Sequence, residues 1–243
     1  MLTIATTSPG VPEIFASLQG EGPSAGRPST FVRLSRCNLA CVWCDTAYTW
    51  HFTGDARPHR GGATFERAPN QIALAESEVA AAIMALGGDR LVITGGEPLL
   101  QGNAIARMLT SVRGHHVEIE TNGTVGPPAA LDARVDQYNV SPKLAHSGNL
   151  AALALVPERL VAWAADPRAF FKFVVAEPDD LAQVLSLQAE YAIPASRLFV
   201  MPEGTTSTAL RNRSRWLGEA CMAHGLRLSD RLHIHLYGDT RGT

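Results

Sequence analysis

Short β-branched or apolar runs alternate with longer Ala/Leu-rich segments along this chain, and that alternation limits its possible folds more than any other feature. A strand followed by a helix, repeated about six times, predicts parallel βα units in an α/β fold. No low-complexity linker divides the 243 residues, so one domain is expected over 1–243. The expected strands are 30–36, 90–94, 116–121, 137–141, 169–175 and 197–201. The expected helices are 76–88, 101–114, 148–165 with an interruption at Pro157, 178–191 and 206–225.

Charge and hydropathy argue against several classes of function. The chain has 21 Lys and Arg against 23 Asp and Glu, and no long basic run. Nucleic acid is therefore not expected as the main partner, because binding to a phosphate backbone needs clustered Lys and Arg. No apolar run reaches membrane-spanning length, and the N-terminus lacks the pattern of a signal peptide. We expect no membrane partner and a cytoplasmic location.

Gly, Pro or polar residues follow each of the six expected strands. The carboxyl ends of parallel strands lie on one face of a barrel, so segments that are dispersed in the sequence are expected to converge there. These segments are the cysteine-rich stretch after 30–36, then GGEPLLQ, NGT, PK, AEPDD and PEG.

Three of the four cysteines lie within eight positions of a turn-rich stretch, in a C-x3-C-x2-C pattern; they are Cys37, Cys41 and Cys44. This spacing can bring three thiolates around one object. A zinc site would need a fourth ligand, which His51 or His59 could provide. An iron–sulfur cluster with three protein ligands would instead leave one iron open to a small molecule. Cys221 lies in a helical segment and is expected to be a small buried hydrophobic residue.

The cysteine spacing, with Trp43 before the last cysteine and TGGEPLLQ at 94–101, resembles the radical S-adenosylmethionine superfamily. The resemblance implies a [4Fe–4S] cluster on the three cysteines, with S-adenosylmethionine chelating the fourth iron. Trp43, Gly95 and Gly96 are the implied cofactor contacts, and Glu97 the implied acceptor for the ammonium group of the cofactor. An electron from the cluster would break the S–C5′ bond, and the resulting radical would remove an unactivated hydrogen.

Within this superfamily the chain resembles the 7-carboxy-7-deazaguanine synthases over nearly its whole length. The segments that carry this resemblance are SLQGEG, the cysteine motif ending in CDT at 44–46, ETNGT, NVSPK, FKFVV, VMPEG and HIHLYGDTRGT. The family converts 6-carboxy-5,6,7,8-tetrahydropterin to 7-carboxy-7-deazaguanine with loss of ammonia, on the route to queuosine. Membership would imply an incomplete parallel (β/α)6 barrel, a homodimer, Mg²⁺ and an external electron donor of the flavodoxin or ferredoxin type.

The family resemblance also implies residue roles. Arg33 is the implied partner of the substrate carboxylate, which suits a planar guanidinium, although a structural ion pair is the alternative. Thr46 is the implied Mg²⁺ ligand, with waters and substrate oxygens completing the shell. Glu120 is the implied acid/base or polar contact, unless it is merely exposed at a strand end. The remaining implied substrate contacts are Leu18, Gln19, Gly20, Glu21, Thr94 and His233. The remaining implied cofactor contacts are Ser141, Pro142, Lys143, Met201, Pro202, Glu203 and Gly204.

Several features leave alternatives open. His233 and His235 alternate in RLHIHLYG, which predicts a strand with both rings on one face, whereas His115 and His116 are expected at a loop end without function. Residues 47–75 are rich in Gly, Pro and Arg and predict a loop-rich excursion that covers the cluster, contacts the electron donor or extends a dimer interface. Two other functions compete: a glycyl-radical activase, and a zinc-stabilised binding protein without catalysis.

Overall fold

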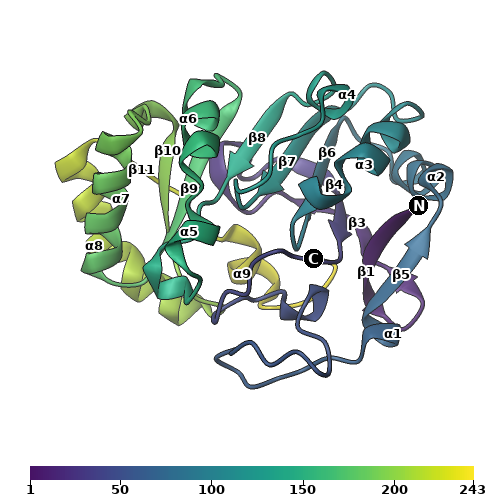
Figure 1. The fold of residues 1–243 in the computed structure, drawn as a ribbon, viewed down its shortest axis with the longest axis horizontal. Coiled ribbons are helices and arrows are strands. Elements are labelled where there is room, and N and C mark those ends of the chain that lie inside the picture. Colours follow the sequence, from purple (N-terminus) through teal and green to yellow (C-terminus); the bar gives the residue numbers. More distant parts are fainter.

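Six parallel strands form the centre of the molecule in a computed structural model that describes residues 1–243. Their order in the sheet is their order in the chain, which confirms the repeated βα units (Figure 1). The two ends of the sheet do not pair with each other, so the barrel is incomplete. The six strands are β4 (Pro28–Leu34), β6 (Arg90–Gly95), β7 (His116–Thr121), β8 (Gln137–Val140), β9 (Ala169–Val175) and β10 (Leu198–Pro202).

Each of the five predicted helical segments contains a helix, whereas α1, α4 and α9 lie outside the predicted set. Predicted helix 148–165 is two helices, because Pro157 takes the first position of the second one, where its missing N–H is not needed. Gly225 ends the long helix near the C-terminus in a left-handed conformation. The helices are α1 (Arg67–Asn70), α2 (Glu76–Leu86), α3 (Gly102–Leu109), α4 (Ala129–Asp132), α5 (Ala151–Ala154), α6 (Pro157–Ala165), α7 (Pro178–Glu190), α8 (Ser207–His224) and α9 (Leu232–Tyr237).

Five strands lie outside the predicted set. β3 pairs antiparallel with β4, β5 pairs antiparallel with β1, and β11 extends the parallel sheet beyond β10. The excursion at 47–75 is therefore not loop throughout, because it ends in α1 and in an edge strand. β1, β2 and β3 are followed by no α-helix. β5 and β11 precede α2 and α9 but are only four and two residues long, so the alternation did not reveal them. They are β1 (Leu2–Ser8), β2 (Val11–Pro12), β3 (Ile14–Leu18), β5 (Gln71–Leu74) and β11 (Arg227–Leu228).

The segment around His233 is a helix, so its prediction as a strand is wrong. Residues two apart on a helix point about 200° apart, and the two histidines therefore face different ways. His233 faces a cavity, whereas His235 Nε2 lies 3.2 Å from Asp230 Oδ1. A six-residue run is too short for period two to distinguish a strand from a helix. His116 is likewise the first residue of β7 and not a loop end.

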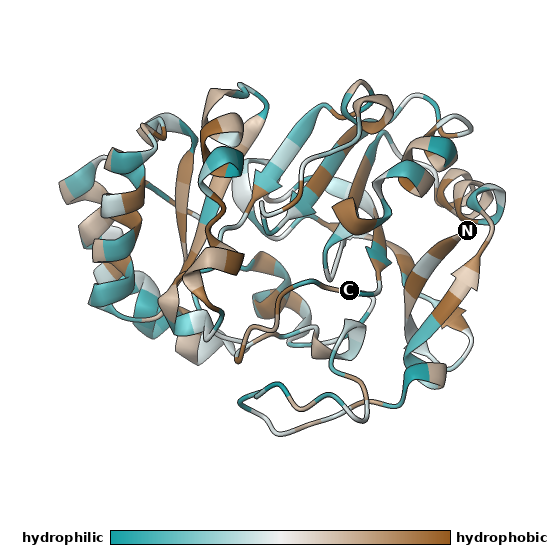
Figure 2. Ribbon diagram, viewed as in Figure 1, coloured by the Kyte–Doolittle hydropathy of each residue, from teal (hydrophilic) through white to brown (hydrophobic).

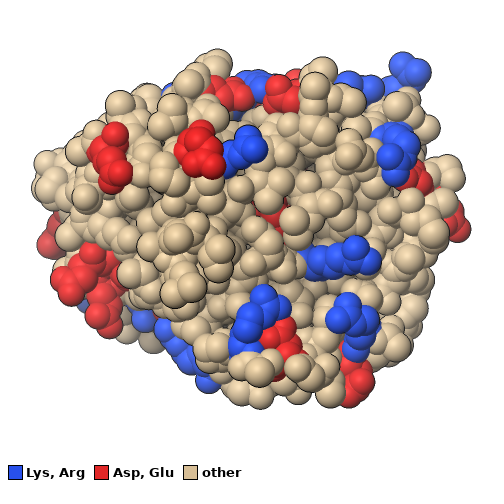
Figure 3. All heavy atoms as spheres, viewed as in Figure 1, with Lys and Arg blue, Asp and Glu red and all other residues tan.

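One hydrophobic core of 38 buried residues lies between the sheet and the helices. Figure 2 shows that β9 and β10 are mostly hydrophobic, whereas β7, β8 and the outer helices α7 and α8 mix hydrophobic and hydrophilic residues. Positive and negative side chains are interspersed on the face shown in Figure 3. None of the helices combines the length and the hydropathy that crossing a membrane requires.

Candidate active site

A cavity of about 390 Å³ opens at the carboxyl ends of the parallel strands, a size typical of small-molecule sites. It collects residues that the sequence places in distant segments, as the geometry of parallel strands requires. The predicted site residues that line it are Leu18, Gln19, Gly20, Glu21, Arg33, Cys37, Cys41, Trp43, Cys44, Thr46, Thr94, Gly95, Gly96, Glu120, Ser141, Lys143, Met201, Pro202, Glu203, Gly204 and His233.

Two predicted cofactor contacts, Glu97 and Pro142, do not line the cavity. The Glu97 side chain is fully buried, and burial raises its pKa. Its carboxylate accepts hydrogen bonds from Asn122 N at 2.7 Å, from Leu99 N at 2.9 Å and from the Thr121 hydroxyl at 2.9 Å. It therefore joins the loop after β6 to the end of β7, and the structure does not turn it toward a cofactor.

The AEPDD segment after β9 also lies away from the cavity. Asp180 Oδ2 accepts hydrogen bonds from Ala176 N at 2.8 Å and from Glu177 N at 3.0 Å, which fixes the start of α7. β9 instead reaches the cavity through Lys172 and Val174. Convergence at the strand ends is thus confirmed for five of the six segments.

Three free thiols, those of Cys37, Cys41 and Cys44, line one side of the cavity. Burial raises the thiol pKa of Cys37 to about 12 and that of Cys44 to about 11, so a metal must displace these protons when it binds. No three Cys, His, Asp or Glu side chains lie close enough to hold a single ion. A four-iron cluster offers each thiolate a separate iron, so its ligands need not converge on one point. The three cysteines therefore fit a cluster better than one zinc ion.

Neither candidate histidine supplies a fourth metal ligand. The two ring nitrogens of His51 lie 2.8 Å from Ala63 O and 3.0 Å from Arg57 O. His59 Nε2 lies 2.8 Å from the carbonyl oxygen of Cys44. Cys221 is buried in α8 and does not line the cavity, as expected for a small hydrophobic residue.

Gly95 and Gly96 let the loop after β6 pack directly against the loop that carries the cysteines. A Cβ atom on Gly96 would lie 2.0 Å from Arg36 O and 3.0 Å from Cys37 Cβ. Gly95 has a φ of +138°, and a Cβ there would lie 2.1 Å from Leu34 O. Only glycine at both positions permits this close approach.

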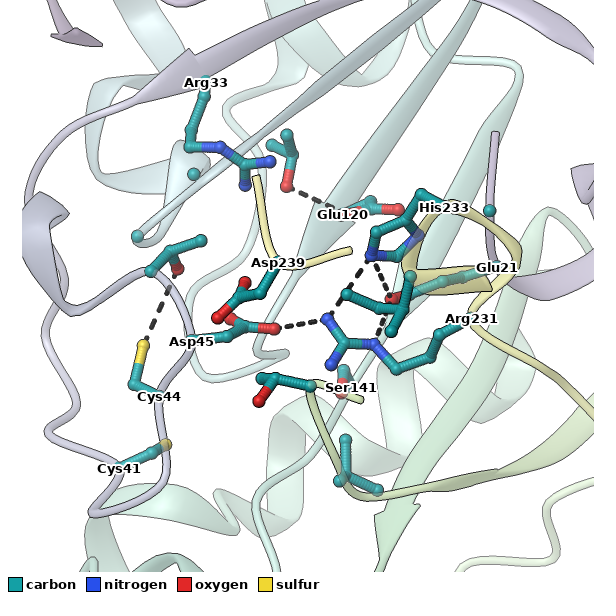
Figure 4. Close-up of a pocket in the computed structure, with 18 of the residues that line it drawn as sticks. Glu21, Arg33, Cys41, Cys44, Asp45, Glu120, Ser141, Arg231, His233 and Asp239 are labelled. Carbon is teal, nitrogen blue, oxygen red and sulfur yellow. Dashed lines mark hydrogen bonds and ion pairs between the residues drawn. The ribbon is translucent and has the colours of Figure 1, made fainter. Parts of the chain in front are cut away.

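Arg33 takes part in an ion pair and still has two free nitrogens. Its Nε donates to Glu13 Oε1 at 2.8 Å, and the Tyr48 hydroxyl donates to Glu13 Oε2 at 2.9 Å. Burial alone would lower the pKa of Arg33, but Glu13 outweighs this effect and raises it. The two terminal nitrogens of the guanidinium make no hydrogen bond within the chain, and Arg33 lines the cavity, where Figure 4 shows it among the other labelled residues. These two nitrogens are thus free to bind a planar anion such as a carboxylate.

A buried charge network occupies the opposite side of the cavity (Figure 4). Arg231 Nε donates to Glu21 Oε1 at 3.0 Å, and Arg231 Nη2 pairs with Asp45. Lys172 Nζ pairs with the other oxygen of Glu21. Burial alone would raise the pKa of Glu21, but the two cations hold it far below its usual range. His233 lies 3.9 Å from Glu21, and burial lowers its pKa, which leaves the ring neutral near pH 7.

Sequence reasoning missed Asp45, Lys172 and Arg231 as site residues. Lys172 had a usable signal, because it is the only charged residue in the otherwise apolar strand AFFKFVV, and a charge there needs a partner. Asp45 and Arg231 had none, because their pairing joins positions 186 residues apart.

Glu120 points into the cavity from β7 and is not a freely exposed strand-end residue. Its Oε2 accepts from the Thr94 hydroxyl at 2.8 Å, and its Oε1 accepts from Gln19 Nε2 at 3.1 Å. Gln19 Nε2 also donates to Glu118 Oε1 at 2.7 Å. Burial and the neighbouring Glu120 raise the pKa of Glu118. Gln19 thus bridges two carboxylates and fixes the one that faces the cavity.

An incomplete parallel barrel whose first strand leads into three cysteines facing a strand-end cavity defines a radical S-adenosylmethionine enzyme. The model of the radical SAM superfamily matches residues 32–146. A 7-carboxy-7-deazaguanine synthase of Pyrobaculum aerophilum is 36% identical over 98% of this chain and 99% of its own length. One from Halobacterium salinarum is 34% identical over 95% and 91%. The chain belongs to the 7-carboxy-7-deazaguanine synthase family.

The fold agrees with this assignment. A crystal structure of QueE from Escherichia coli superimposes with a TM-score of 0.66 at 25% identity, covering 95% of each chain. Family membership confirms the resemblance found in the sequence and excludes the two competing functions, the glycyl-radical activase and the zinc-stabilised binding protein. It also implies the [4Fe–4S] cluster and S-adenosylmethionine.

Proposed function

We propose that this protein converts 6-carboxy-5,6,7,8-tetrahydropterin to 7-carboxy-7-deazaguanine with release of ammonia, in the biosynthesis of queuosine and related deazapurines. One observation carries the proposal: the two free guanidinium nitrogens of Arg33 and the carboxylate of Glu120 line the same cavity as the three cysteines. S-adenosylmethionine, cleaved reductively at the cluster, would supply the radical that removes hydrogen from C6 of the pterin. The side chains of the cavity bind and orient the substrate.

Each polar group of the cavity suits one part of the pterin. Arg33 would bind the carboxylate through two parallel hydrogen bonds. Gln19 and Glu21 would form hydrogen bonds with the edge of the pterin ring that carries its donors and acceptors, and Leu18 and Gly20 would contact the ring beside them. Glu120 would hold or move a proton at the reacting ring, because Thr94 and Gln19 fix both of its oxygens. His233, neutral near pH 7, would be a further hydrogen-bonding partner.

The cofactor would lie between the cysteine loop and the loops after β8 and β10. Lys143 Nζ donates to Ser141 O at 2.6 Å and to Ser141 Oγ at 2.9 Å, which shapes the loop after β8. The residues from Met201 to Gly204 form the adjoining wall of the cavity. Trp43, whose ring stacks on His146 at 5.3 Å, closes the side next to the cysteines.

The proposal is tested by anaerobic incubation of reconstituted protein with reductant, S-adenosylmethionine, Mg²⁺ and 6-carboxytetrahydropterin, followed by mass spectrometry. We expect 7-carboxy-7-deazaguanine in more than stoichiometric amount relative to S-adenosylmethionine consumed, because the cofactor is regenerated. A reaction without substrate is the control. Cleavage of S-adenosylmethionine without this product would agree with a radical SAM enzyme but contradict 6-carboxytetrahydropterin as its substrate.

Thr46 is the proposed Mg²⁺ ligand. Its hydroxyl faces the cavity two residues after Cys44, and its Oγ1 lies 3.6 Å from Cys44 Sγ. A hydroxyl oxygen can ligate a cation while its proton is donated to a thiolate, so the two contacts are compatible. Waters and substrate oxygens would complete the shell, because Mg²⁺ keeps several waters and recruits substrate groups.

Replacing Thr46 by alanine is expected to raise the Mg²⁺ concentration for half-maximal rate about tenfold, since one contact to a charged partner is worth about 1.5 kcal/mol. Initial rates measured across a Mg²⁺ series test this. Thr205→Ala, which removes another hydroxyl from the same cavity, is the matched control and is expected to leave the Mg²⁺ dependence unchanged. Loss of iron from Thr46→Ala would make Thr46 structural and contradict the assignment.

A homodimer and an external electron donor of the flavodoxin or ferredoxin type complete the proposal. Their support is family membership, because relatives that span almost the same length match the chain from end to end. Sedimentation at several protein concentrations tests the dimer. Single-turnover rates with flavodoxin or ferredoxin in place of a chemical reductant test the donor.

A further inference from the structure

Two side chains from outside the cysteine loop donate hydrogen bonds to cysteine sulfurs. Trp50 Nε1 donates to Cys44 Sγ at 3.4 Å, and Asn149 Nδ2 donates to Cys41 Sγ at 3.3 Å. No side chain donates to Cys37 Sγ. The three thiols that fit the cluster are therefore unequal.

The indole of Trp50 is held rigidly. Its side chain is buried at 4% exposure, with the Arg57 guanidinium 4.8 Å above the ring and the His51 ring 4.9 Å away. His51 is itself fixed by carbonyl groups at both ring nitrogens. The loop that follows Trp50 returns to the cysteine loop, where Arg60 N donates to Val42 O at 2.6 Å. The first part of the excursion thus holds an N–H against Cys44.

The amide of Asn149 has only one orientation that satisfies its neighbours. Its Oδ1 accepts from Ala40 N at 2.9 Å, which places Nδ2 on the side of Cys41. Nδ2 also donates to the Ser147 hydroxyl oxygen at 3.1 Å. A flipped amide would set its nitrogen against the donor of Ala40 and its oxygen against the sulfur, losing these contacts.

We propose that Trp50 and Asn149 are positioning residues that set the reduction potential of the cluster. The inference rests on the cluster that the proposed function requires. One-electron reduction takes its electron from an external reductant and adds negative charge to the cluster and its thiolates. An N–H aimed at a thiolate sulfur stabilises the reduced form more than the oxidised form, so each donor raises the potential. Losing either donor makes the cluster harder to reduce.

The test is a redox titration of reconstituted protein, monitored by electron paramagnetic resonance without substrate. We expect Trp50→Phe to lower the equilibrium constant for reduction about tenfold, which is about 59 mV for one electron. Asn149→Ala is expected to act in the same direction. Trp216→Phe changes the same side chain in α8 and Asn38→Ala removes an amide from the cysteine loop; neither side chain donates a hydrogen bond to a cysteine sulfur, so both controls should keep the original potential.

An unchanged potential in either variant with full iron and sulfide content would overturn the role of that donor. Loss of iron from both variants would make the contacts structural and would also overturn the proposal. If only one variant loses its iron, the reduction potential of the other variant tests the proposal: a lowered potential supports it and an unchanged potential overturns it. Because the titration contains no pterin, it stays valid even if the protein binds the cluster but makes no 7-carboxy-7-deazaguanine.

Discussion

Cys41→Ala is expected to abolish formation of 7-carboxy-7-deazaguanine while the protein stays folded. The cysteine loop supplies three thiols, and neither His51 nor His59 lines the cavity to replace a lost ligand. Two thiolates would leave a second iron without a protein ligand, and the cluster would not persist. Iron and acid-labile sulfide per chain, together with product by mass spectrometry, measure the effect.

Cys221→Ala is the matched control for this prediction. Cys41 and Cys221 are each 7% exposed, so the two substitutions remove equally buried sulfurs. Only Cys41 lines the cavity. We expect Cys221→Ala to keep its iron, its sulfide and its activity. Full cluster content in Cys41→Ala, or loss of the cluster from Cys221→Ala, would show that the ligand set is misassigned.

Lys172→Met is expected to lower the free energy of unfolding by about 3 kcal/mol, because it removes one partner of a buried carboxylate. Lys172 is 7% exposed, Glu21 is 9% exposed, and the two are paired. Arg231 stays bound to Glu21 but is shared with Asp45, so it cannot compensate fully. Urea unfolding of the purified protein, with the midpoint and the slope fitted together, measures the change.

Arg107→Met is the control for Lys172→Met. Arg107 also pairs with a glutamate, Glu76 at 2.7 Å, but its side chain is 62% exposed. Solvent screens such a pair, and its loss is expected to cost less than about 1 kcal/mol. The double variant Glu21→Gln with Lys172→Met should recover part of the stability, since no unpaired charge remains. Equal losses in Lys172→Met and Arg107→Met would show that the buried network does not stabilise the fold.

The alternation of strands and helices was sufficient to predict the parallel half of the fold. β7 and β9 begin and end at the predicted residues: β7 alternates apolar and polar side chains, and β9 is apolar apart from Lys172. β1 and β5 were not predicted because these antiparallel strands depend on partners far along the chain, whereas β3 pairs with the next strand, β4, and was missed because no α-helix follows it. β5, for example, pairs with a strand about seventy residues earlier.

The structure brings most of the predicted site residues to one cavity, but it turns some of their side chains toward partners that the sequence does not show. Gly95 and Gly96 of the GGE motif were implied cofactor contacts, and both line the cavity, where their backbone packs closely against Leu34 and Arg36. The same motif did not reveal that Glu97 turns into the protein, because three donors from two loops surround it there. Sequence spacing cannot show which of two directions a carboxylate takes when both offer hydrogen bonds.

The sequence by itself determined the repeated βα units, the three-cysteine loop and the family, because these depend on local periodicity and on spacing within a few residues. Only the tertiary structure decided that Arg231 joins Glu21 to Asp45, and that Trp50 and Asn149 donate to the thiols. Those contacts join segments up to 210 residues apart, and their geometry exists only when the strand ends have converged. Lys172 is buried for the same reason: its partner Glu21 reaches it across the cavity from before the first parallel strand.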